Sequence, residues 1–402
     1  MTEISYPQPR ECLYQPSSPY QNLGKEGPMH RVRLWNGDHV WLVTGHQHAR
    51  RLLSDPGVSA DRERPDFPVV LPRFEADIFK PLALIGVDAP KHTAHRKLLA
   101  PEFGVRQVRS LQPTVTRLAN ELIDKMLHKG PPADLVADYA LPIPSTVISE
   151  LLGVPYADHD FFETASMNLL QAKDAEGAEA AGRALWDYLD GLITAEQRQP
   201  TGSGVLAKLV AAMDDDYFAR DELLRIALTL LLGGHDTTAS MIALGTLTLL
   251  ENPDQLAAFK ADPAVVPDAV EELLRMISVT DLSGVRVADR DIEIDGQLIR
   301  AGEGIVVCSS MANRDPDVYD DPYTFDIGRD GRSEDAPVRR HLTFGYGVHQ
   351  CLGQNLARME LETAYRVLFE RIPGLRLAVP TEQLPVRRGS TMQGVHELPV
   401  AW

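Results

Sequence analysis

The chain has 402 residues, of which 44% are hydrophobic and 24% charged, and its 57 acidic and 40 basic side chains give a net charge of −17. Such a composition is typical of a folded globular protein and excludes long disorder, and the negative charge excludes nucleic acid as a general partner, because phosphate backbones are repelled. The three cysteines are too few and too far apart for a secreted disulfide framework, so we expect a cytoplasmic protein.

The first 28 residues contain five prolines and lack the basic start and apolar run of a signal peptide, so residues 1–28 are expected to form an irregular arm that anchors nothing in a membrane. Apolar residues then alternate in 31–35 and 40–43 around the pair Asn36-Gly37, which predicts a β-hairpin with a tight turn. From Val105 apolar residues recur every three or four positions until Gly130 and two prolines, which predicts a long helix with a defined end.

Helical spacing also marks 180–197, 221–250, 265–277 and 356–372. Between the last two segments, short apolar runs at 292–294, 298–299 and 305–307 are separated by turn residues and predict a small sheet. The Gly/Ser cluster at 201–204 is short enough to be a loop. We therefore expect a mainly α fold with small β-sheets, built as one domain over residues 1–402.

The predicted helix 221–250 contains an unusual polar stretch. Its apolar part, 226–232, is shorter than the ~20 residues of a membrane span and is followed by Gly233-Gly-His-Asp-Thr-Thr238. Asp236 can exchange protons with water and Thr237 can donate a hydrogen bond, and a hydroxyl that bonds back to its own helix would open a local bulge. The alternative is a polar packing patch or a buried water site, and the stretch alone does not decide between them.

Cys351 lies in Phe344-Gly-Tyr-Gly-Val-His-Gln-Cys-Leu-Gly353, just before the helix predicted from Leu356. Its thiol therefore meets a helix amino terminus, which favours the thiolate, the form that binds metals. The glycines let the backbone approach something large and flat. An isolated cysteine would more commonly be buried and inert. A zinc site lacks further ligands nearby, and the glycines do not match the dinucleotide-binding pattern.

The pattern F-x-x-G-x-x-x-C-x-G, formed by Phe344, Gly347, Cys351 and Gly353, resembles the haem-binding loop of the cytochromes P450. The resemblance implies the P450 fold, a triangular prism in which haem b lies between the oxygen-side helix and the cysteine-loop helix. It also implies that Cys351 is the axial thiolate ligand of the haem iron, a ligation that favours O–O cleavage. The cofactor contacts implied in this loop are Phe344, Gly345, His349, Cys351 and Gly353, with His349 at a haem propionate.

Three further parts of the sequence match the same family. His92 and Arg96, one helical turn apart, and Arg286, in a short apolar run, occupy positions that bind haem propionates in the family. Asp236 and Thr237 match the acid–alcohol pair of the oxygen-side helix, which implies that they are the catalytic residues that manage protons.

Glu272-Leu-Leu-Arg275 resembles the family's E-x-x-R pair, which is structural. The family's third partner for this pair is an arginine, but Thr324 occupies its position here. Arg329 or His341 is expected to serve instead.

The resemblance also places a substrate pocket. The apolar segment 66–85 would cover it, and such a lid suits a large hydrophobic substrate, although each residue taken singly could equally fill the core. Asp281 is expected to lie in a solvent-facing turn rather than in the pocket. The implied pocket residues are Phe79, Leu84, Leu230, Gly234, Val279, Leu282 and Met392.

The implied activity is that of a soluble bacterial monooxygenase that inserts one oxygen atom from O₂ into a hydrophobic small molecule by hydroxylation or epoxidation. The segments 58–62 and 64–68 resemble actinomycete subgroups that act on polyketides, macrolides, terpenoids or xenobiotics. Electrons would come from NAD(P)H through a ferredoxin reductase and a ferredoxin.

Basic residues on the cysteine side would dock this acidic ferredoxin, namely Lys97, Arg106, Arg109, Arg339 and Arg340. The protein is expected to be a monomer. A peroxide-driven peroxygenase and a non-catalytic haem-binding protein are the alternatives, and the intact Asp236-Thr237 pair counts against both.

Overall fold

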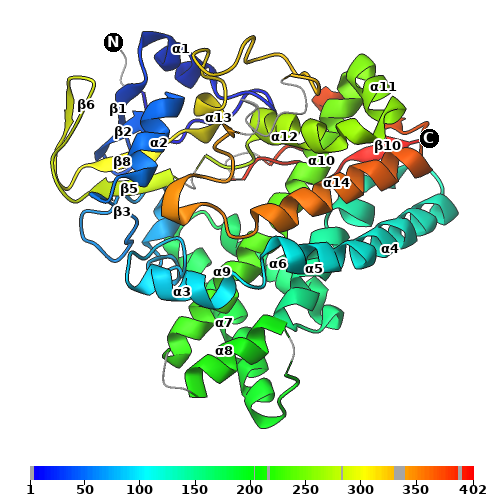
Figure 1. The fold of residues 1–402 in the computed structure, drawn as a ribbon, viewed down its shortest axis with the longest axis horizontal. Helices are drawn as coiled ribbons and strands as arrows, with labels where there is room; N and C mark the ends of the chain where they lie inside the picture. Colours follow the sequence, from blue (N-terminus) through cyan, green and yellow to red (C-terminus); the bar gives the residue numbers. More distant parts are fainter. Residues whose placement is uncertain (1–3, 203, 215–217, 282–283, 330–339, 388–391) are drawn as a thin grey trace.

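The computed structural model describes residues 4–402 except 203, 215–217, 282–283, 330–339 and 388–391. Helices dominate this part of the chain, and the strands are short (Figure 1). The helices are α1 (Ser18–Glu26), α2 (His46–Ser54), α3 (Lys91–Leu99), α4 (Val105–Lys129), α5 (Pro142–Leu152), α6 (His159–Leu170), α7 (Ala175–Arg198), α8 (Gly204–Asp214), α9 (Arg220–Gly234), α10 (Asp236–Glu251), α11 (Pro253–Ala261), α12 (Val266–Ile277), α13 (Ser309–Ala312) and α14 (Gln354–Arg371).

The largest sheet has five strands in the order β1-β2-β8-β5-β3. Their bounds, in that order, are Met29–Arg33, His39–Val43, Gly304–Val307, Gly284–Ala288 and Val58–Ser59. β2 and β8 are parallel, with Val40 opposite Gly304, and the other neighbours are antiparallel. Every residue of β5 and β8 is buried, which accounts for the continuous apolar run of β8.

Two smaller sheets complete the strands. One pairs β10 (Pro399–Ala401) with β4 (Ala133–Asp134) and β9 (Arg376–Leu377), and the other is the hairpin of β6 (Ile292–Ile294) and β7 (Gln297–Ile299).

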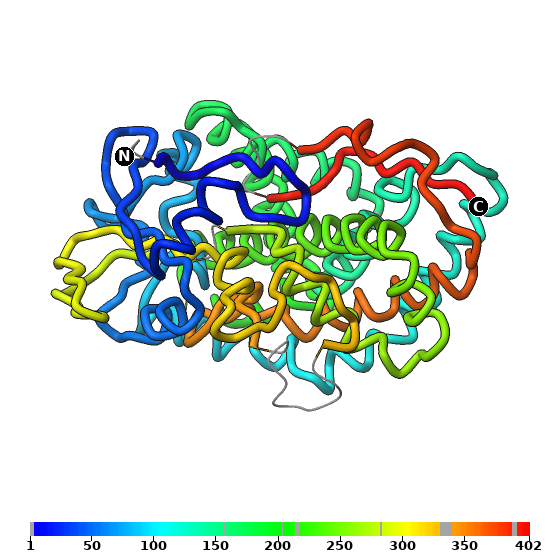
Figure 2. Tube along the Cα trace, turned by 90° about the horizontal axis from the view of Figure 1, so that it is seen from above, coloured from blue at the N-terminus to red at the C-terminus, as the bar shows by residue number. Residues whose placement is uncertain are grey.

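The five-stranded sheet lies at the end of the molecule that carries the N terminus, and the C terminus lies at the opposite end (Figures 1 and 2). In Figure 1 the outline is wide along its upper edge and narrows to α7 and α8 below. α4 packs beside α14, and α10 packs between α14 and α5. The largest cluster of buried apolar side chains extends from Leu13 to Val400 and includes all of these helices. Among the described helices, none is both long and apolar enough to cross a membrane.

Most of the predicted elements are confirmed. β1 and β2 form the hairpin, and Gly37 takes a φ of +93° in its turn, a conformation that favours glycine. The long predicted helix is α4, which ends at Gly130 with a φ of +78°. The helices predicted over 180–197, 265–277 and 356–372 are α7, α12 and α14.

Three predictions need correction. The arm 1–28 is not irregular throughout, because residues 18–26 form α1, where Pro19 lies in the first turn and its missing N–H is tolerated. The run 305–307 does not join the sheet of 292–299 but forms β8, which has strand neighbours on both sides and so pairs more of its backbone groups. The helix predicted over 221–250 is two helices, α9 and α10, separated at His235.

Candidate active site

Cys351 is held by a tightly closed loop at the start of α14. Its backbone N–H donates to the carbonyl oxygen of Phe344 across 2.8 Å. Gly345 and Gly347 adopt φ angles of +70° and +74°, and a Cβ at Gly347 would lie 2.5 Å from the carbonyl oxygen of Leu53. Glycine at 347 is therefore required both by its conformation and by the close approach of α2.

Two opposing effects of the surrounding protein act on the pKa of the Cys351 thiol. The side chain itself is exposed, yet the protein atoms around it remove water and raise the pKa of the thiol. Hydrogen bonds from the backbone N–H groups of Gly353 and Gln354, together with the guanidinium charges of Arg96 and Arg358, lower that pKa. These donors at the amino terminus of α14 are suited to stabilise an anionic sulfur.

His92 of α3 packs against His349 of this loop, with the two rings tilted by 44°. Their ring centres are 4.1 Å apart, and Nδ1 of His349 donates to the carbonyl oxygen of Leu84 across 3.0 Å. Burial, helped by neighbouring arginine charges, lowers the pKa of each histidine to about 4. Nε2 of His92 is buried without a hydrogen-bond partner among the described residues.

Three arginines, Arg96, Arg286 and Arg62, lie near His92 and His349 and add positive charge to this part of the site. Arg96 donates from Nη1 to the carbonyl oxygen of Gln350 across 2.8 Å, which ties α3 to the cysteine loop. Burial lowers the pKa of Arg286 to about 10. Burial, together with the charge of Arg286, does the same for Arg62. Nε of Arg62 is buried without a partner in the described chain. Arg62 was not predicted as a site residue, because a single arginine after a two-residue strand forms no recognisable sequence pattern.

These residues fit a haem. Its iron requires a thiolate that can be reached, which Cys351 supplies at a helix amino terminus. Its two carboxylates require buried cations and donors, and the unpaired atoms of His92 and Arg62, with Arg286 beside them, are of that kind.

The break between α9 and α10 places the predicted acid–alcohol pair. Asp236 begins α10, and the hydroxyl of Thr237 donates to the carbonyl oxygen of Gly233 across 3.0 Å, as expected for a bulge held by a back-bonding hydroxyl. A Cβ at Gly234 would come 2.6 Å from Ile148 of α5, whereas one at Gly233 would meet no atom within 4 Å. Gly233 therefore borders open space, while Gly234 lies against α5 and stays a predicted pocket residue.

The other predicted pocket residues, apart from Leu282, lie in the protein interior. Phe79, Leu84, Leu230, Val279 and Met392 are buried. Phe79 lines a cavity of about 290 Å³ together with Val70, Phe74, Val285 and Arg62. Leu282 lies outside the described residues.

Asp281 does not lie in a solvent-facing turn as predicted. Its Oδ2 pairs with Nη2 of Arg10 across 2.8 Å, and its Oδ1 accepts from the backbone N–H of Ser310 across 2.8 Å. The N-terminal arm thus supplies a cation that sequence spacing could not reveal, and this cation offsets the cost of partly burying the carboxylate.

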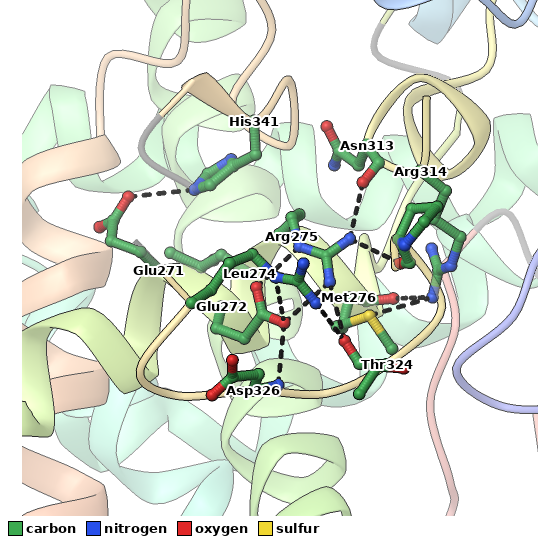
Figure 3. A network of polar contacts seen from close by, with 12 residues as sticks. Glu271, Glu272, Leu274, Arg275, Met276, Asn313, Arg314, Thr324, Asp326 and His341 are labelled. Carbon is green, nitrogen blue, oxygen red and sulfur yellow. Dashed lines mark hydrogen bonds and ion pairs between the residues drawn. The ribbon is translucent and has the colours of Figure 1, made fainter. Parts of the chain in front are cut away.

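Figure 3 shows the buried E-x-x-R pair with several of its partners. Glu272 and Arg275 form a two-pronged ion pair at 2.7 and 2.8 Å and are both fully buried. Arg329 donates from Nε to Oε1 of Glu272 across 3.2 Å, whereas His341 lies 3.2 Å from Glu271. Of the two expected candidates, Arg329 is therefore the third partner. Thr324 contributes only its carbonyl oxygen, which accepts from Arg275 and Arg329.

Four of the five predicted docking residues are described. Lys97, Arg106, Arg109 and Arg340 are all exposed, and Arg339 lies outside the described residues.

Comparisons with known proteins agree with this geometry. A profile of the cytochrome P450 family matches residues 263–372. Cytochrome P450 105A3 of Streptomyces carbophilus is 52% identical over 99% of this chain and 96% of that protein, and the vitamin D3 dihydroxylase of Streptomyces griseolus is 50% identical over 99% and 97%. The crystal structure of the mycinamicin VIII C21 methyl hydroxylase of Micromonospora griseorubida has a TM-score of 0.92 and 35% identity, and the match covers 99% of this chain and 100% of that one.

The matches extend over nearly the whole chain, far beyond the cysteine loop that first suggested them. The mainly α arrangement with small sheets is thus the P450 fold. The chain belongs to the cytochrome P450 family, and it is a haem-thiolate monooxygenase.

Proposed function

We propose that the cofactor is haem b and that Cys351 is the axial ligand of its iron. The observation that carries this proposal is the exposed thiol of Cys351 at the amino terminus of α14, next to buried donors that lack partners in the described chain. Phe344, Gly345 and Gly353 would form the surface under the haem ring.

The haem propionates would bind to His92, Arg96, Arg286 and His349. The pKa of the two histidines, about 4, is lowered first by burial and further by the positive charges around them. A carboxylate placed among these groups would raise both pKa values and form charge-assisted hydrogen bonds.

When bound, a haem thiolate activates O₂ with two electrons and two protons, so that one oxygen atom enters the substrate and the other leaves as water. Asp236 and Thr237 would deliver the protons. The hydroxyl of Thr237 donates to the carbonyl of Gly233 in this structure and has lone pairs free to accept a hydrogen bond, so it could pass on its own proton as it receives another. The carboxylate of Asp236, in the neighbouring position, would carry protons from water to that hydroxyl.

The substrate would be a hydrophobic secondary metabolite or xenobiotic that is hydroxylated or epoxidised. Support comes from the buried apolar side chains of Phe79, Leu84, Leu230, Val279 and Met392. Leu282 remains a proposed member of this pocket. Two relatives also support a hydrophobic substrate that is hydroxylated, because their names describe hydroxylation of vitamin D3 and of mycinamicin VIII.

The electron donors would be ferredoxin and an NAD(P)H-dependent ferredoxin reductase. An acidic ferredoxin needs a local basic face on a chain of net charge −17, and Lys97, Arg106, Arg109 and Arg340, which are all exposed, would supply one. We place the protein in the cytoplasm, as a monomer of one domain, because its cysteines are few and its main core draws on residues from Leu13 to Val400.

Absorbance spectroscopy tests the assignment of Cys351. The reduced protein with CO is expected to show the red-shifted Soret band of thiolate ligation, and Cys351→Ala to abolish it. Cys308→Ala is the matched control, because Cys308 is buried and burial raises the pKa of its thiol to about 12. An unchanged band in Cys351→Ala would overturn the assignment.

Turnover of Thr237→Ala separates a monooxygenase from a peroxygenase. With NADPH and redox partners, product should fall and hydrogen peroxide rise, because the proton donor is lost. Full NADPH-driven activity in this variant would remove Thr237 from the proton path.

A further inference from the structure

The carboxylate proposed to carry protons has an ion-pair partner that the sequence analysis missed. Nη1 of Arg387 lies 2.7 Å from Oδ1 of Asp236, and the two side chains are only 10% and 17% exposed. Nη1 also lies 3.5 Å from the hydroxyl of Ser240, one turn further along α10. An ion pair so largely shielded from water is stronger than a surface pair, because the surrounding dielectric is lower.

The position of Arg387 is fixed by its surroundings. Its backbone N–H donates to the carbonyl oxygen of Gly394 across 3.0 Å. A Cβ at Gly394 would come within 3.0 Å of the Ser240 hydroxyl and 3.3 Å of Cδ of Arg387. The bare backbone at Gly394 therefore leaves the space in which the arginine stem reaches α10. Nε of Arg387 is buried there without a hydrogen-bond partner in the described chain. The contact between the guanidinium and the carboxylate of Asp236 is made by Nη1.

The segment that carries Arg387 also contacts the proposed substrate pocket. Val386 pairs with Val395, and Met392 pairs with Thr280. The backbone N–H of Gln393 donates to the carbonyl oxygen of Val279 across 2.7 Å. The described residues 386–387 and 392–395 thus contact both Val279, a proposed pocket residue, and the carboxylate of Asp236.

We propose that Arg387 is a positioning residue for Asp236: its ion pair fixes one carboxylate oxygen and holds the other in place for proton transfer. Within the described residues, Oδ2 of Asp236 has no such partner, so it is the oxygen left to exchange protons. The proposal rests on the proposed role of Asp236. It adds that the orientation of this acid depends on the same backbone that forms part of the pocket wall.

A double-mutant cycle tests the proposal with wild type, Arg387→Met, Asp236→Asn and the double variant. The readout is the fraction of NADPH electrons released as hydrogen peroxide, measured with vitamin D3 as the probe and also with no added substrate. Arg387→Met should raise this fraction several-fold and lower any vitamin D3 product by about tenfold, part of the contribution of a well-placed acid. In the Asp236→Asn background it should add nothing, because the group it positions is gone. Arg387→Lys should restore part of the loss.

Two further measurements separate positioning from general damage. The CO spectrum and haem content should be unchanged in Arg387→Met. The midpoints of thermal unfolding should be non-additive across the cycle, since both single variants break the same pair. Arg371→Met is the matched control, because Arg371 pairs with Asp124 away from this site and its loss should leave the peroxide fraction unchanged.

The outcomes separate the proposed role of Asp236 from that of Arg387. If Asp236→Asn leaves the peroxide fraction at the wild-type value, the proposed role of Asp236 fails. If Asp236→Asn raises it while Arg387→Met does not, or if the two effects add, the role of Asp236 stands and that of Arg387 is overturned.

Discussion

Arg329 reaches back from the segment after α13 to donate to Glu272, on α12, across 3.2 Å. It fills the place that the family's usual arginine leaves empty where this chain has Thr324. The same carboxylate accepts from Arg275 and from the backbone N–H of Asp326, so α12 and the segment 326–329 meet on one buried group (Figure 3).

Removing Arg329 should therefore destabilise the protein. We expect Arg329→Met to lower the free energy of unfolding by about 1–3 kcal/mol, the cost of a lost hydrogen bond to a charged group that stays buried. Urea unfolding of the haem-loaded protein measures this. Arg290→Met, which breaks an exposed pair with Asp55, should cost less than about 1 kcal/mol. An equal effect of both substitutions would contradict the role given to Arg329.

Gly347→Ala should impair haem loading. Alanine at a φ of +74° costs about 1–2 kcal/mol, and its Cβ would also collide with the carbonyl of Leu53, which together shift the cysteine loop. The measurement is haem per polypeptide after expression with excess haem precursor. A Cβ at Gly374 would meet no atom within 4 Å, so Gly374→Ala is the control and should load normally. Normal loading of both variants would show that the loop tolerates the shift.

His95 should make stability depend on pH. Its Nδ1 accepts from the backbone N–H of Leu84 across 3.4 Å, and its Nε2 donates to Glu222 across 2.7 Å, so the ring is neutral. Burial lowers the pKa of His95 below 6.5, although Glu222 partly opposes this. The unfolded chain therefore binds a proton first, and the stability contributed by neutral His95 is complete above about pH 6.5 and is lost as the pH falls below it.

Unfolding free energies measured from pH 7.5 to 5 check this. The decline should be steeper in wild type than in His95→Gln, which cannot titrate. His128→Gln, far along α4 at its last turn, is the control and should keep the wild-type slope. Parallel curves for wild type and His95→Gln would assign the acid sensitivity to other groups.

Charge reversal should locate the ferredoxin surface. Arg109→Glu and Arg340→Glu are expected to slow reduction by ferredoxin several-fold at low salt and to weaken its salt dependence, because steering is electrostatic. Stopped-flow reduction of the CO complex measures the rate, while substrate binding should stay unchanged. Arg300→Glu, an exposed change next to the β6–β7 hairpin, is the control. Unchanged rates in both docking variants would exclude this face.

The sequence predicted those features that neighbouring residues determine. Asn36-Gly37 predicted the hairpin, and Gly130 predicted the end of α4. The cysteine loop predicted both the helix that follows it and the family. The sequence did not predict ion pairs whose two residues are far apart along the chain. Nothing in the spacing of Arg387 relates it to Asp236, 151 residues away, and Arg10 and Asp281 are separated by 271. Such pairs exist only once the helices have packed, so local periodicity carries no trace of them.

The backbone of Leu84 is held from two sides, by His349 of the cysteine loop at its carbonyl and by His95 of α3 at its N–H. For efforts to change the substrate range, this sets a practical boundary. Exposed side chains of the segment 66–85 can be varied in a library, whereas Phe79 is buried against Phe74 and should be replaced only by apolar residues of similar volume. Insertions, deletions or a proline next to position 84 would detach the segment from the cysteine loop, so designs should preserve the chain length between Phe79 and His95.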